Sequence, residues 1–301
     1  MDAIEVKSVT QLIRSVDLSS ALYVVATPIG NLRDITLRAL DTLSAVDIIY
    51  AEDTRQTRRL LDAYGIKTTL RTYHDHNGAH MRPQILSGLE KGERLALVSD
   101  AGTPLISDPG FKLVREVREA GFDVVPIPGP SALTAALSAG GLPTDTFTFA
   151  GFLPVKKGQR LDRLKSFADQ KTTLVLYESG NRLADTVTAI IEVFGPQTEL
   201  VMAREITKMF ETIIHSEAGM FLERLNEEGP PKGEIVLMVS LDGEGQQEVS
   251  DEDIDAFLIE KMTTLGAKGA AAEASRKFDR PKRELYARAV SVQAKERSED
   301  D

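Results

Sequence analysis

Short apolar runs that end in turn signals alternate with amphipathic stretches over the first half of the chain, from about Ala21 to Gly140. The runs have the length of strands, and the stretches between them repeat apolar positions at helical spacing. The predicted strands are Leu22–Ala26, Asp47–Ala51, Leu70–Tyr73, Leu95–Ser99 and Val124–Ile127. Because strands that alternate with helices are joined by crossovers, this half predicts a mostly parallel sheet covered by helices.

A second region of strands begins near Thr144. Its apolar runs are Phe147–Phe152, Thr173–Tyr177, Leu200–Ala203, Glu211–His215 and Ile235–Ser240. The segments 200–207 and 210–216, separated by Lys208 and Met209, have the pattern of a hairpin and therefore predict a mixed sheet. The sequence thus predicts an α/β chain with an N-terminal tail (residues 1–20) and two domains, residues 21–140 and 141–242, which meet near Gly140–Pro143.

The composition changes at Gly243, where a Gly-, Gln- and acid-rich segment reads as a linker. The pattern of residues 251–293 predicts three short helices. We assign them to a helical tail that spans residues 251–296. Between Lys261 and Arg288 there are eight Lys or Arg and three Asp or Glu, a local net charge of about +5 (8 − 3). Helical patterns on both sides of the turn before Pro281 match a helix-turn-helix layout, and the alternative is a small packing module that binds nothing.

The overall charge and the absence of cysteine narrow the class of protein. A net charge of −10 argues against non-specific coating of nucleic acid but leaves room for a local basic patch. Zero Cys excludes disulfides, thiolate metal sites and Cys nucleophiles, which suits a reducing cytoplasm. No apolar run approaches the roughly 20 residues of a membrane span, and no signal peptide is recognisable, so we expect a soluble cytoplasmic protein.

The loop Ser99–Gly110 is the most informative segment, because it places two Gly, two Pro and two acidic residues directly after a buried strand. Ligands of open α/β sheets bind at this end of the strands, where Gly lets the backbone approach them. An ordinary strand-to-helix turn, with Pro109 at the start of the next helix, would have a similar composition. The loop alone leaves both interpretations open.

The loops lack the sequence patterns of dinucleotide-binding, P-loop and metal sites. The segment Thr27–Thr36 after the first strand holds one Gly and a Pro, which is not the G-x-G-x-x-G pattern of a dinucleotide fold, and no P-loop occurs. His74, His76 and His80 could suggest a metal, but they lie in a predicted loop without a known metal-binding spacing. We therefore expect no metal and assign these rings to polar contacts or packing.

Several motifs occur together, in one order and at one spacing. They are Thr27–Leu32, Ala51–Arg55, His74–Asn77, Ser99–Pro104, Pro128–Ala132, Gly151–Pro154, Tyr177–Ser179, Arg204–Lys208 and Lys232–Glu234. In this combination the chain resembles the ribosomal RNA small subunit methyltransferase I family of the tetrapyrrole methylase superfamily. The resemblance covers residues 21–241, and the tail is similar to the helix-turn-helix extension of that family.

The resemblance implies a homodimer of two-domain subunits with a tetrapyrrole-methylase-like fold and S-adenosylmethionine in the cleft between the domains. It also implies methyl transfer to the ribose 2′-hydroxyl of a decoding-region cytidine in small-subunit (16S) ribosomal RNA, with neither membrane nor DNA as partner. Two alternatives remain: a methyltransferase for a tetrapyrrole-like small molecule, and a catalytically silent RNA-binding protein. The shared fold does not choose between them.

A sulfonium cofactor carries no phosphate, so it needs apolar walls, backbone partners and a carboxylate rather than a phosphate cradle. Ser131 and Ala132 begin a predicted helix, whose free N–H groups can bind a carboxylate. Tyr177 could close the cleft, or it could be a core residue with a hydrogen-bonded hydroxyl. The residues assigned to the cofactor by motif are Pro28, Ile29, Gly30, Asp100, Ala101, Gly102, Thr103, Pro104, Ser131, Ala132, Tyr177, Ala203 and Gly233.

Methyl transfer to an alcohol needs in-line placement and a group that receives a weakly acidic proton. The catalytic candidates stand at or just beyond predicted strand ends: Glu52, Asp53, Arg55, Glu178 and Glu205. The candidate RNA contacts are basic residues that could bind phosphate: Lys156, Lys157, Arg160, Lys208, Arg276, Lys277, Arg280, Lys282 and Arg283. Ion pairs within the protein, or solvated helix faces, would account for the same charges.

Overall fold

A computed structural model describes residues 13–242, 251–278 and 281–299 of the chain, and side chains in the tail only for 254–275, 277–278 and 281–292. Two compact units are present: Met1–Leu164 with Thr172–Leu241, and Lys165–Lys171 with Asp242–Asp301. No helix among the described residues combines the length and the apolarity that a bilayer crossing requires.

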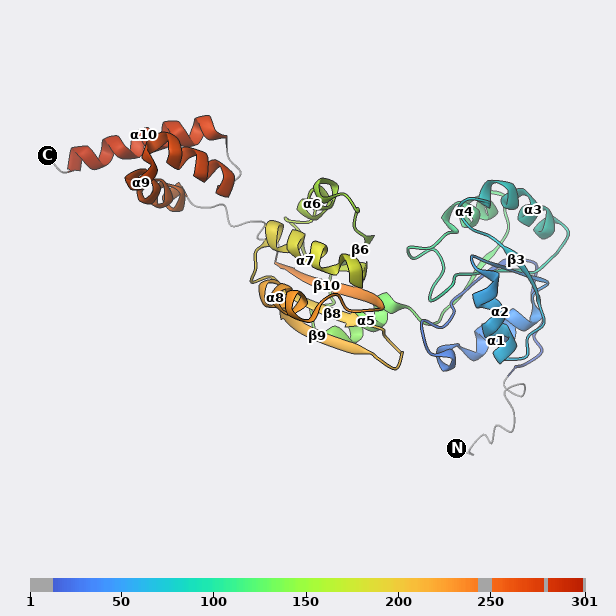
Figure 1. Ribbon diagram of the computed structural model, residues 1–301. Helices are drawn as coiled ribbons and strands as arrows, with labels where there is room; N and C mark the ends of the chain where they lie inside the picture. The colour runs from blue at the N-terminus through green and yellow to red at the C-terminus, as the bar shows by residue number, and fades with distance from the viewer. Residues whose placement is uncertain (1–12, 243–250, 279–280, 300–301) are drawn as a thin grey trace. The chain divides into compact units, whose positions relative to one another are not determined.

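The first sheet contains five parallel strands in the order β3-β2-β4-β1-β5 (Figure 1). These strands are β1 (Leu22–Val25), β2 (Ile48–Ala51), β3 (Thr69–Thr72), β4 (Leu95–Val98) and β5 (Val124–Ile127). Strands β1, β2 and β4 are almost entirely buried, as expected where helices cover both faces. All five strands lie within one residue of their predicted positions, and the predicted parallel α/β sheet is confirmed.

Two pairs of helices cover opposite faces of this sheet. Leu40 and Leu61 pack with Ile49 in one apolar cluster, and Ile85 and Leu113 pack on the other side of the sheet. The helices of the first face are α1 (Leu37–Ala45) and α2 (Thr54–Ala63), preceded by a short 3-10 helix, η2 (Leu32–Asp34), and those of the second face are α3 (Gly78–Glu90) and α4 (Phe111–Glu119). The loops after β1, β2 and β4 therefore all meet at the carboxyl edge of the sheet.

Helix α5 (Ala132–Gly140) follows the first sheet but packs on the second. The second sheet is mixed and runs β6-β7-β10-β8-β9, with β6 and β7 parallel and β8 antiparallel to both of its neighbours. Helices α7 and α8 lie on the face opposite α5 (Figure 1). The remaining elements are β6 (Phe147–Phe152), α6 (Lys157–Lys165), β7 (Lys171–Ser179), α7 (Gly180–Phe194), β8 (Glu199–Arg204), β9 (Thr212–Glu217), α8 (Ala218–Glu228) and β10 (Glu234–Asp242). The predicted hairpin is β8–β9, and the predicted mixed sheet is confirmed.

The second unit holds the two C-terminal helices, α9 (Asp251–Phe278) and α10 (Lys282–Glu299). Gly266 interrupts α9 with non-helical φ and ψ of 63° and 170°, so three helical segments result, as predicted. Leu258 and Leu285 pack in a small core between the helices, and Arg288 donates to Asp255 at 2.6 Å. Pro281 lies one residue before α10, and its carbonyl accepts from the first turn of that helix.

Candidate functional site

Loops at the carboxyl edge of the first sheet form one side of a cavity. The loop after β1 and the loop after β4 are joined by a two-way backbone bridge: Thr27 N–H donates to the Gly102 carbonyl at 2.9 Å, and Gly102 N–H donates to that of Thr27 at 3.0 Å. The hydroxyl of Thr103 donates to the Pro130 carbonyl at 3.1 Å, which links the same loop to the start of α5. Three separate segments are thus held as one wall.

The loop after β4 contains two residues in a backbone conformation that favours glycine. Leu105 and Ser107 have φ of 73° and 65°. On the other side, β6 bulges at Gly151, whose φ is 61°, and an ideal Cβ there would lie 2.9 Å from the hydroxyl oxygen of Ser107. Strained loop residues that persist are held by their surroundings, and they cluster at functional sites. Gly151 provides the space that this loop needs.

The cavity has a volume of about 360 Å³, within the size range of small-molecule sites. Its lining includes most of the residues assigned to the cofactor from the motifs: Ile29, Asp100, Ala101, Gly102, Thr103, Ser131, Ala132, Tyr177, Ala203 and Gly233. Pro28, Gly30 and Pro104 are not part of the lining, although each adjoins a residue that is. The structure therefore brings together residues from seven of the sequence motifs.

Apolar side chains that were not assigned to the cofactor complete the walls: Ile106, Phe152, Ile206, Ile235 and Val236. Tyr177 stands edge-on to Phe149 and Phe152, with ring centroids 4.9 and 5.8 Å apart. Its hydroxyl interacts with the backbone N–H of Leu133 in the first turn of α5, although burial outweighs this and raises the pKa of the phenol. Tyr177 is therefore at once a packed residue and a wall of the cavity.

The start of α5 faces this cavity through Ser131 and Ala132. The Ser131 side chain makes no capping hydrogen bond, and the Tyr177 hydroxyl lies beside the Leu133 N–H in the first turn of this nine-residue helix. The N–H groups at a helix start, together with the positive end of the helix dipole, favour an anion. The site can hold a carboxylate there without a basic side chain.

Carboxylates gather on the side of the cavity that the first sheet provides. Burial raises the pKa of Asp108 to about 6; an interaction with the Ser99 hydroxyl opposes the rise, and the charges of Glu52 and Asp100 add to it. Burial likewise raises the pKa of Glu52, with the Asp100 charge as the next contribution. Asp100 accepts a hydrogen bond from the Asp53 backbone N–H at 2.9 Å, which ties the loop after β2 to the cavity wall. The result is a site of negative potential with apolar walls.

The sequence of the chain was also compared with known proteins. Residues 21–221 match the family described as Tetrapyrrole (Corrin/Porphyrin) Methylases, and residues 248–293 match the RsmI C-terminal HTH domain. Proteins named ribosomal RNA small subunit methyltransferase I are 46% identical in Mesorhizobium japonicum, over 91% of this chain and 93% of that protein, and 48% identical in Escherichia coli O157:H7, over 90% and 95%. The chain belongs to the ribosomal RNA small subunit methyltransferase I family of tetrapyrrole methylases.

Solved structures agree with this methyltransferase in fold. The methyltransferase CobJ superposes with a TM-score of 0.56 at 19% identity, over 73% of this chain and 94% of that one. Cobalt precorrin-4 methyltransferase CbiF gives a TM-score of 0.54 at 18% identity, over 78% and 97%. At these identities the likeness extends to the fold alone, and it confirms the predicted tetrapyrrole-methylase-like architecture.

Among the catalytic candidates of this methyltransferase, Asp53 and Arg55 form a surface ion pair. Asp53 caps α2 and accepts from the Arg55 guanidinium at 2.7 Å, which lowers the pKa of the carboxyl to about 2. A carboxyl group with so low a pKa is a weak proton acceptor at neutral pH. Neither residue belongs to the cavity lining.

Glu178 lines the cavity, but its carboxylate is 1% exposed and already engaged. One oxygen accepts from the Ser179 backbone N–H at 2.9 Å and lies 3.4 Å from the Arg182 guanidinium, and the other accepts from the Thr186 hydroxyl at 2.6 Å. These partners hold the end of β7 against α7. The geometry fits a residue that shapes the cavity better than one that receives a proton.

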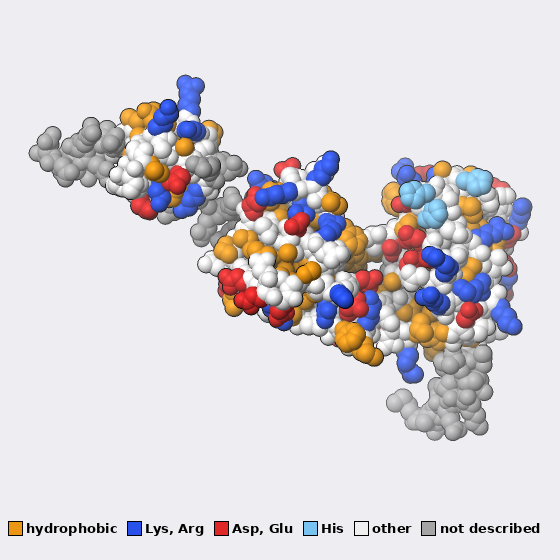
Figure 2. Space-filling view, viewed as in Figure 1, with side chains coloured by type: hydrophobic (Ala, Val, Ile, Leu, Met, Phe, Trp, Pro, Cys, Tyr) orange, Lys and Arg blue, Asp and Glu red, His pale blue; other side chains and the backbone are white. Residues whose placement is uncertain are grey.

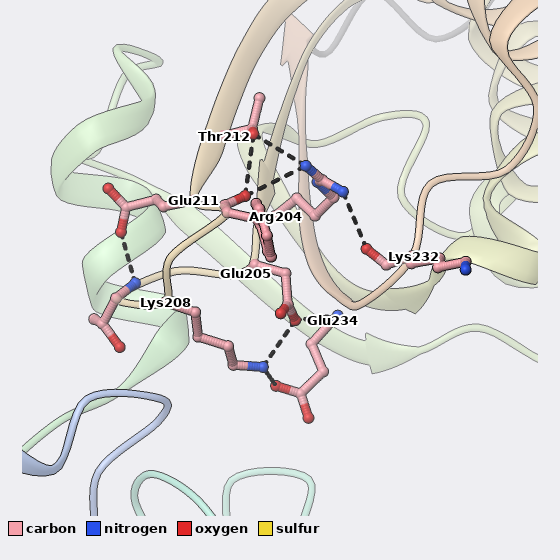
Figure 3. A network of polar contacts seen from close by, with 9 residues as sticks. Arg204, Glu205, Lys208, Glu211, Thr212, Lys232 and Glu234 are labelled. Atoms are coloured by element: carbon pink, nitrogen blue, oxygen red, sulfur yellow. Dashed lines mark hydrogen bonds and ion pairs between the residues drawn. The ribbon is translucent and has the colours of Figure 1, made fainter.

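Glu205 and Lys208 belong to a polar network beside the cavity (Figure 3). The Lys208 ammonium donates to Glu205 and to Glu234, each at 2.8 Å, and the Glu234 backbone N–H donates to Glu205 at 3.0 Å. Lys208 lowers the pKa of Glu205 by hydrogen bonding. Burial opposes the charge of Lys208, but its two carboxylate partners outweigh burial and raise its pKa. Both residues are thus committed to holding the β8–β9 loop against the start of β10.

The predicted basic clusters differ in how far they present charge to solvent. Lys156 and Lys157 are exposed, and Lys157 pairs with Glu192 at 3.0 Å. The Arg160 side chain is only 6% exposed, because its guanidinium contacts the Val155 carbonyl and Asp185 at 3.3 Å. Arg160 and Lys208 therefore have internal partners that a phosphate would have to compete with, and their role as phosphate contacts stays a prediction.

In the tail, the candidates Lys277, Lys282 and Arg283 are exposed. Lys277 lies over the Phe257 ring, with its nitrogen 4.2 Å from the centroid. Arg280 and the side chain of Arg276 lie outside the described residues. Three predicted tail contacts thus remain available to a ligand.

A carboxylate of the cavity that the sequence-based assignment missed is Asp108. It stands within the loop Ser99–Gly110 that the sequence had already singled out, and it lines the cavity. The available signal was that Asp108 is one of only two acidic residues in that loop, the other being Asp100. Burial, which gives Asp108 its raised pKa, is a property of the folded chain.

Proposed function

We propose that this chain is an S-adenosylmethionine-dependent enzyme that methylates the ribose 2′-hydroxyl of a decoding-region cytidine in small-subunit (16S) ribosomal RNA. The single observation that carries this proposal is the cavity, in which residues from separate motifs form an apolar wall, the start of helix α5 and a carboxylate side. The family relatives, named for small-subunit ribosomal RNA, support the choice of RNA as acceptor. We further propose a cytoplasmic homodimer, as the family resemblance implies.

The groups that line the cavity fit the carboxylate, the positive charges and the adenine of S-adenosylmethionine. The start of α5 suits its carboxylate, Asp100 or Asp108 suits its ammonium or sulfonium charge, and the apolar walls suit its adenine. When bound, this cofactor supplies an electrophilic methyl group. The residues we assign to it are the predicted set Pro28, Ile29, Gly30, Asp100, Ala101, Gly102, Thr103, Pro104, Ser131, Ala132, Tyr177, Ala203 and Gly233, with Asp108 added.

The ribose hydroxyl loses its proton as the oxygen gains the methyl group, so a nearby acceptor helps. Asp108 and Glu52 suit that role best among the described carboxylates beside the cavity, because burial raises the pKa of each. A raised pKa brings an acid closer to neutrality, where a general base works best. Asp53 and Glu205, whose pKa values are lowered, fit positioning roles instead.

The reaction is tested by incubating the protein with methyl-labelled S-adenosylmethionine and unmethylated small ribosomal subunits. After digestion to nucleosides, mass spectrometry is expected to find label in 2′-O-methylcytidine. Label on a tetrapyrrole and none on RNA would establish the small-molecule alternative. RNA binding without transfer to either acceptor would establish the silent RNA-binding protein.

Asp100→Ala is expected to weaken S-adenosylmethionine binding about tenfold or more, because a carboxylate on the cavity wall and the hydrogen bond from Asp53 are both lost. Isothermal titration calorimetry measures the change directly. Asp145→Ala, which removes an exposed carboxylate outside the cavity, is the matched control and should bind like the unmodified protein. Equal affinity of the two variants would remove Asp100 from the site.

A further inference from the structure

Five arginines lie on the helical face formed by η2, α1 and α2: Arg33, Arg38, Arg55, Arg58 and Arg59. We call them the arginine surface. Four of them are exposed, and Arg58 is half-buried. Figure 2 shows blue side chains spread over the part of the molecule where Figure 1 draws α1 and α2. Arg55 was already a candidate site residue from sequence, whereas Arg33, Arg38, Arg58 and Arg59 were not, since they are dispersed over three segments.

Four of these arginines have no carboxylate partner within the described part of the chain. Arg55 pairs with Asp53, but no ion pair joins Arg33, Arg38, Arg58 or Arg59 to an acid of the described residues. Clustered guanidinium groups of this kind are the electrostatic footprint of a phosphate-binding surface.

Four carboxylates lie on the same elements or at their caps, namely Asp34, Asp41, Asp53 and Asp62, so the five arginines leave a net charge of about +1 (5 − 4). Asp47 pairs with Arg94, and Asp41 accepts from the Arg14 backbone N–H at 2.7 Å. One carboxylate oxygen of Asp34 is buried. Asp62 is the exposed carboxylate among those of η2, α1 and α2 that the structure describes, and the cap residue Asp53 is half-buried.

The arginine surface adjoins the proposed cofactor cavity through the backbone. η2 begins three residues after Ile29, which lines the cavity, and Tyr64 at the end of α2 donates its hydroxyl proton to the Leu32 carbonyl at 2.6 Å. At the other end, the Asp53 backbone N–H that precedes α2 donates to cavity-lining Asp100. A polymer that places one ribose in the cavity would therefore pass close to α1 and α2.

Exposed apolar side chains lie among the charges. Leu32, which precedes Arg33, is 47% exposed, and Leu37, which precedes Arg38, is 56% exposed. Guanidinium groups bind phosphate oxygens bidentately, and apolar side chains next to them can contact ribose or unstacked bases. This mixture fits single-stranded RNA better than a purely ionic partner.

We propose that the arginine surface binds the phosphates of the RNA strand that flanks the methylated nucleotide. The inference rests on the proposed function and adds to it a surface that positions the acceptor. It adds to the phosphate contacts predicted for the exposed tail lysines and for Lys156 and Lys157.

The test is the triple variant Arg33→Gln, Arg38→Gln and Arg59→Gln, which neutralises three exposed members. Its KM for unmethylated small ribosomal subunits should rise about tenfold or more at roughly 0.1 M salt, and the salt dependence of binding should become shallower by about two to three units of slope. S-adenosylmethionine affinity and kcat should stay unchanged. The matched control is Lys112→Gln, Arg115→Gln and Arg118→Gln on α4, which removes three exposed cations across the sheet.

The outcomes separate this inference from the proposed function. Absence of RNA methylation by the unmodified protein would overturn the proposed function. Normal methylation by the unmodified protein, with an unchanged KM and salt slope in the triple variant, would overturn the arginine surface alone. An equal loss in the α4 control would also overturn it, because the effect would then follow net charge rather than this face.

Discussion

Gly180→Ala is expected to lower the free energy of unfolding by about 3 kcal/mol or more, a large effect for the addition of one methyl group. Gly180 begins α7, and an ideal Cβ at this position would overlap the carbonyl oxygen of Pro231. Backbone cannot move aside as a flexible side chain can. The displaced segment leads directly to Gly233 and Glu234, so the variant should also lose S-adenosylmethionine affinity.

Urea denaturation followed by circular dichroism measures the loss of stability, and calorimetry measures cofactor binding. Gly158→Ala is the matched control, because Gly158 also lies in the first turn of a helix but has open space around its Cβ position. Helix propensity favours this substitution by up to about 1 kcal/mol. A Gly180→Ala protein as stable as the Gly158→Ala protein would contradict the close approach of Pro231 to α7.

Asp108→Asn is expected to stabilise the protein at pH 8 and to have little effect at pH 4. Burial raises the pKa of Asp108 from 3.8 to about 6 in the folded state, so its charged form is disfavoured there. Below the pKa of Asp108 in the unfolded chain the group is protonated in both states, so it costs no stability. Above its pKa in the folded protein the group is charged in both states, and the full cost of burying the charge destabilises the fold. Because the group is partly solvated, we expect a gain of about 1 to 3 kcal/mol at pH 8.

The measurement is the free energy of unfolding of both proteins across pH 4 to 8, with the difference between them growing mainly between about pH 4 and 6. Asp169→Asn, at an exposed position, serves as the control and should show no such pH-dependent gain. A constant difference at all pH values would mean that Asp108 titrates in the folded protein as it does in the unfolded chain.

Strand positions could be predicted because local pattern and tertiary environment agree in this fold. The run Phe147–Phe152 coincides with β6, where alternating and apolar residues mark the whole strand. In contrast, β7 extends beyond the predicted Thr173–Tyr177 to Lys171 and Ser179. Those polar ends carry no hydrophobic signal, and they are strand because β7 pairs with neighbours on both sides.

The cavity could be anticipated more fully than the charges around it. Motifs at strand ends place Asp100 and Ser131 in one site, because the carboxyl ends of parallel strands meet at one edge. Arg160 and Lys208 looked like phosphate contacts because sequence shows a charge but not its partner. Burial of the first and the two carboxylates beside the second arise only when distant segments meet.

The reciprocal hydrogen bonds between Thr27 and Gly102 couple the motion of the loop after β1 to that of the loop after β4. Any molecule that tightens one loop must restrict the thermal motion of the other, so binding energy gained at either is shared by both. Amino-acid changes in these two loops should consequently depend on one another during evolution, even where their side chains never touch. The two backbone hydrogen bonds thus link the loop that precedes η2 to the loop that lines the cavity.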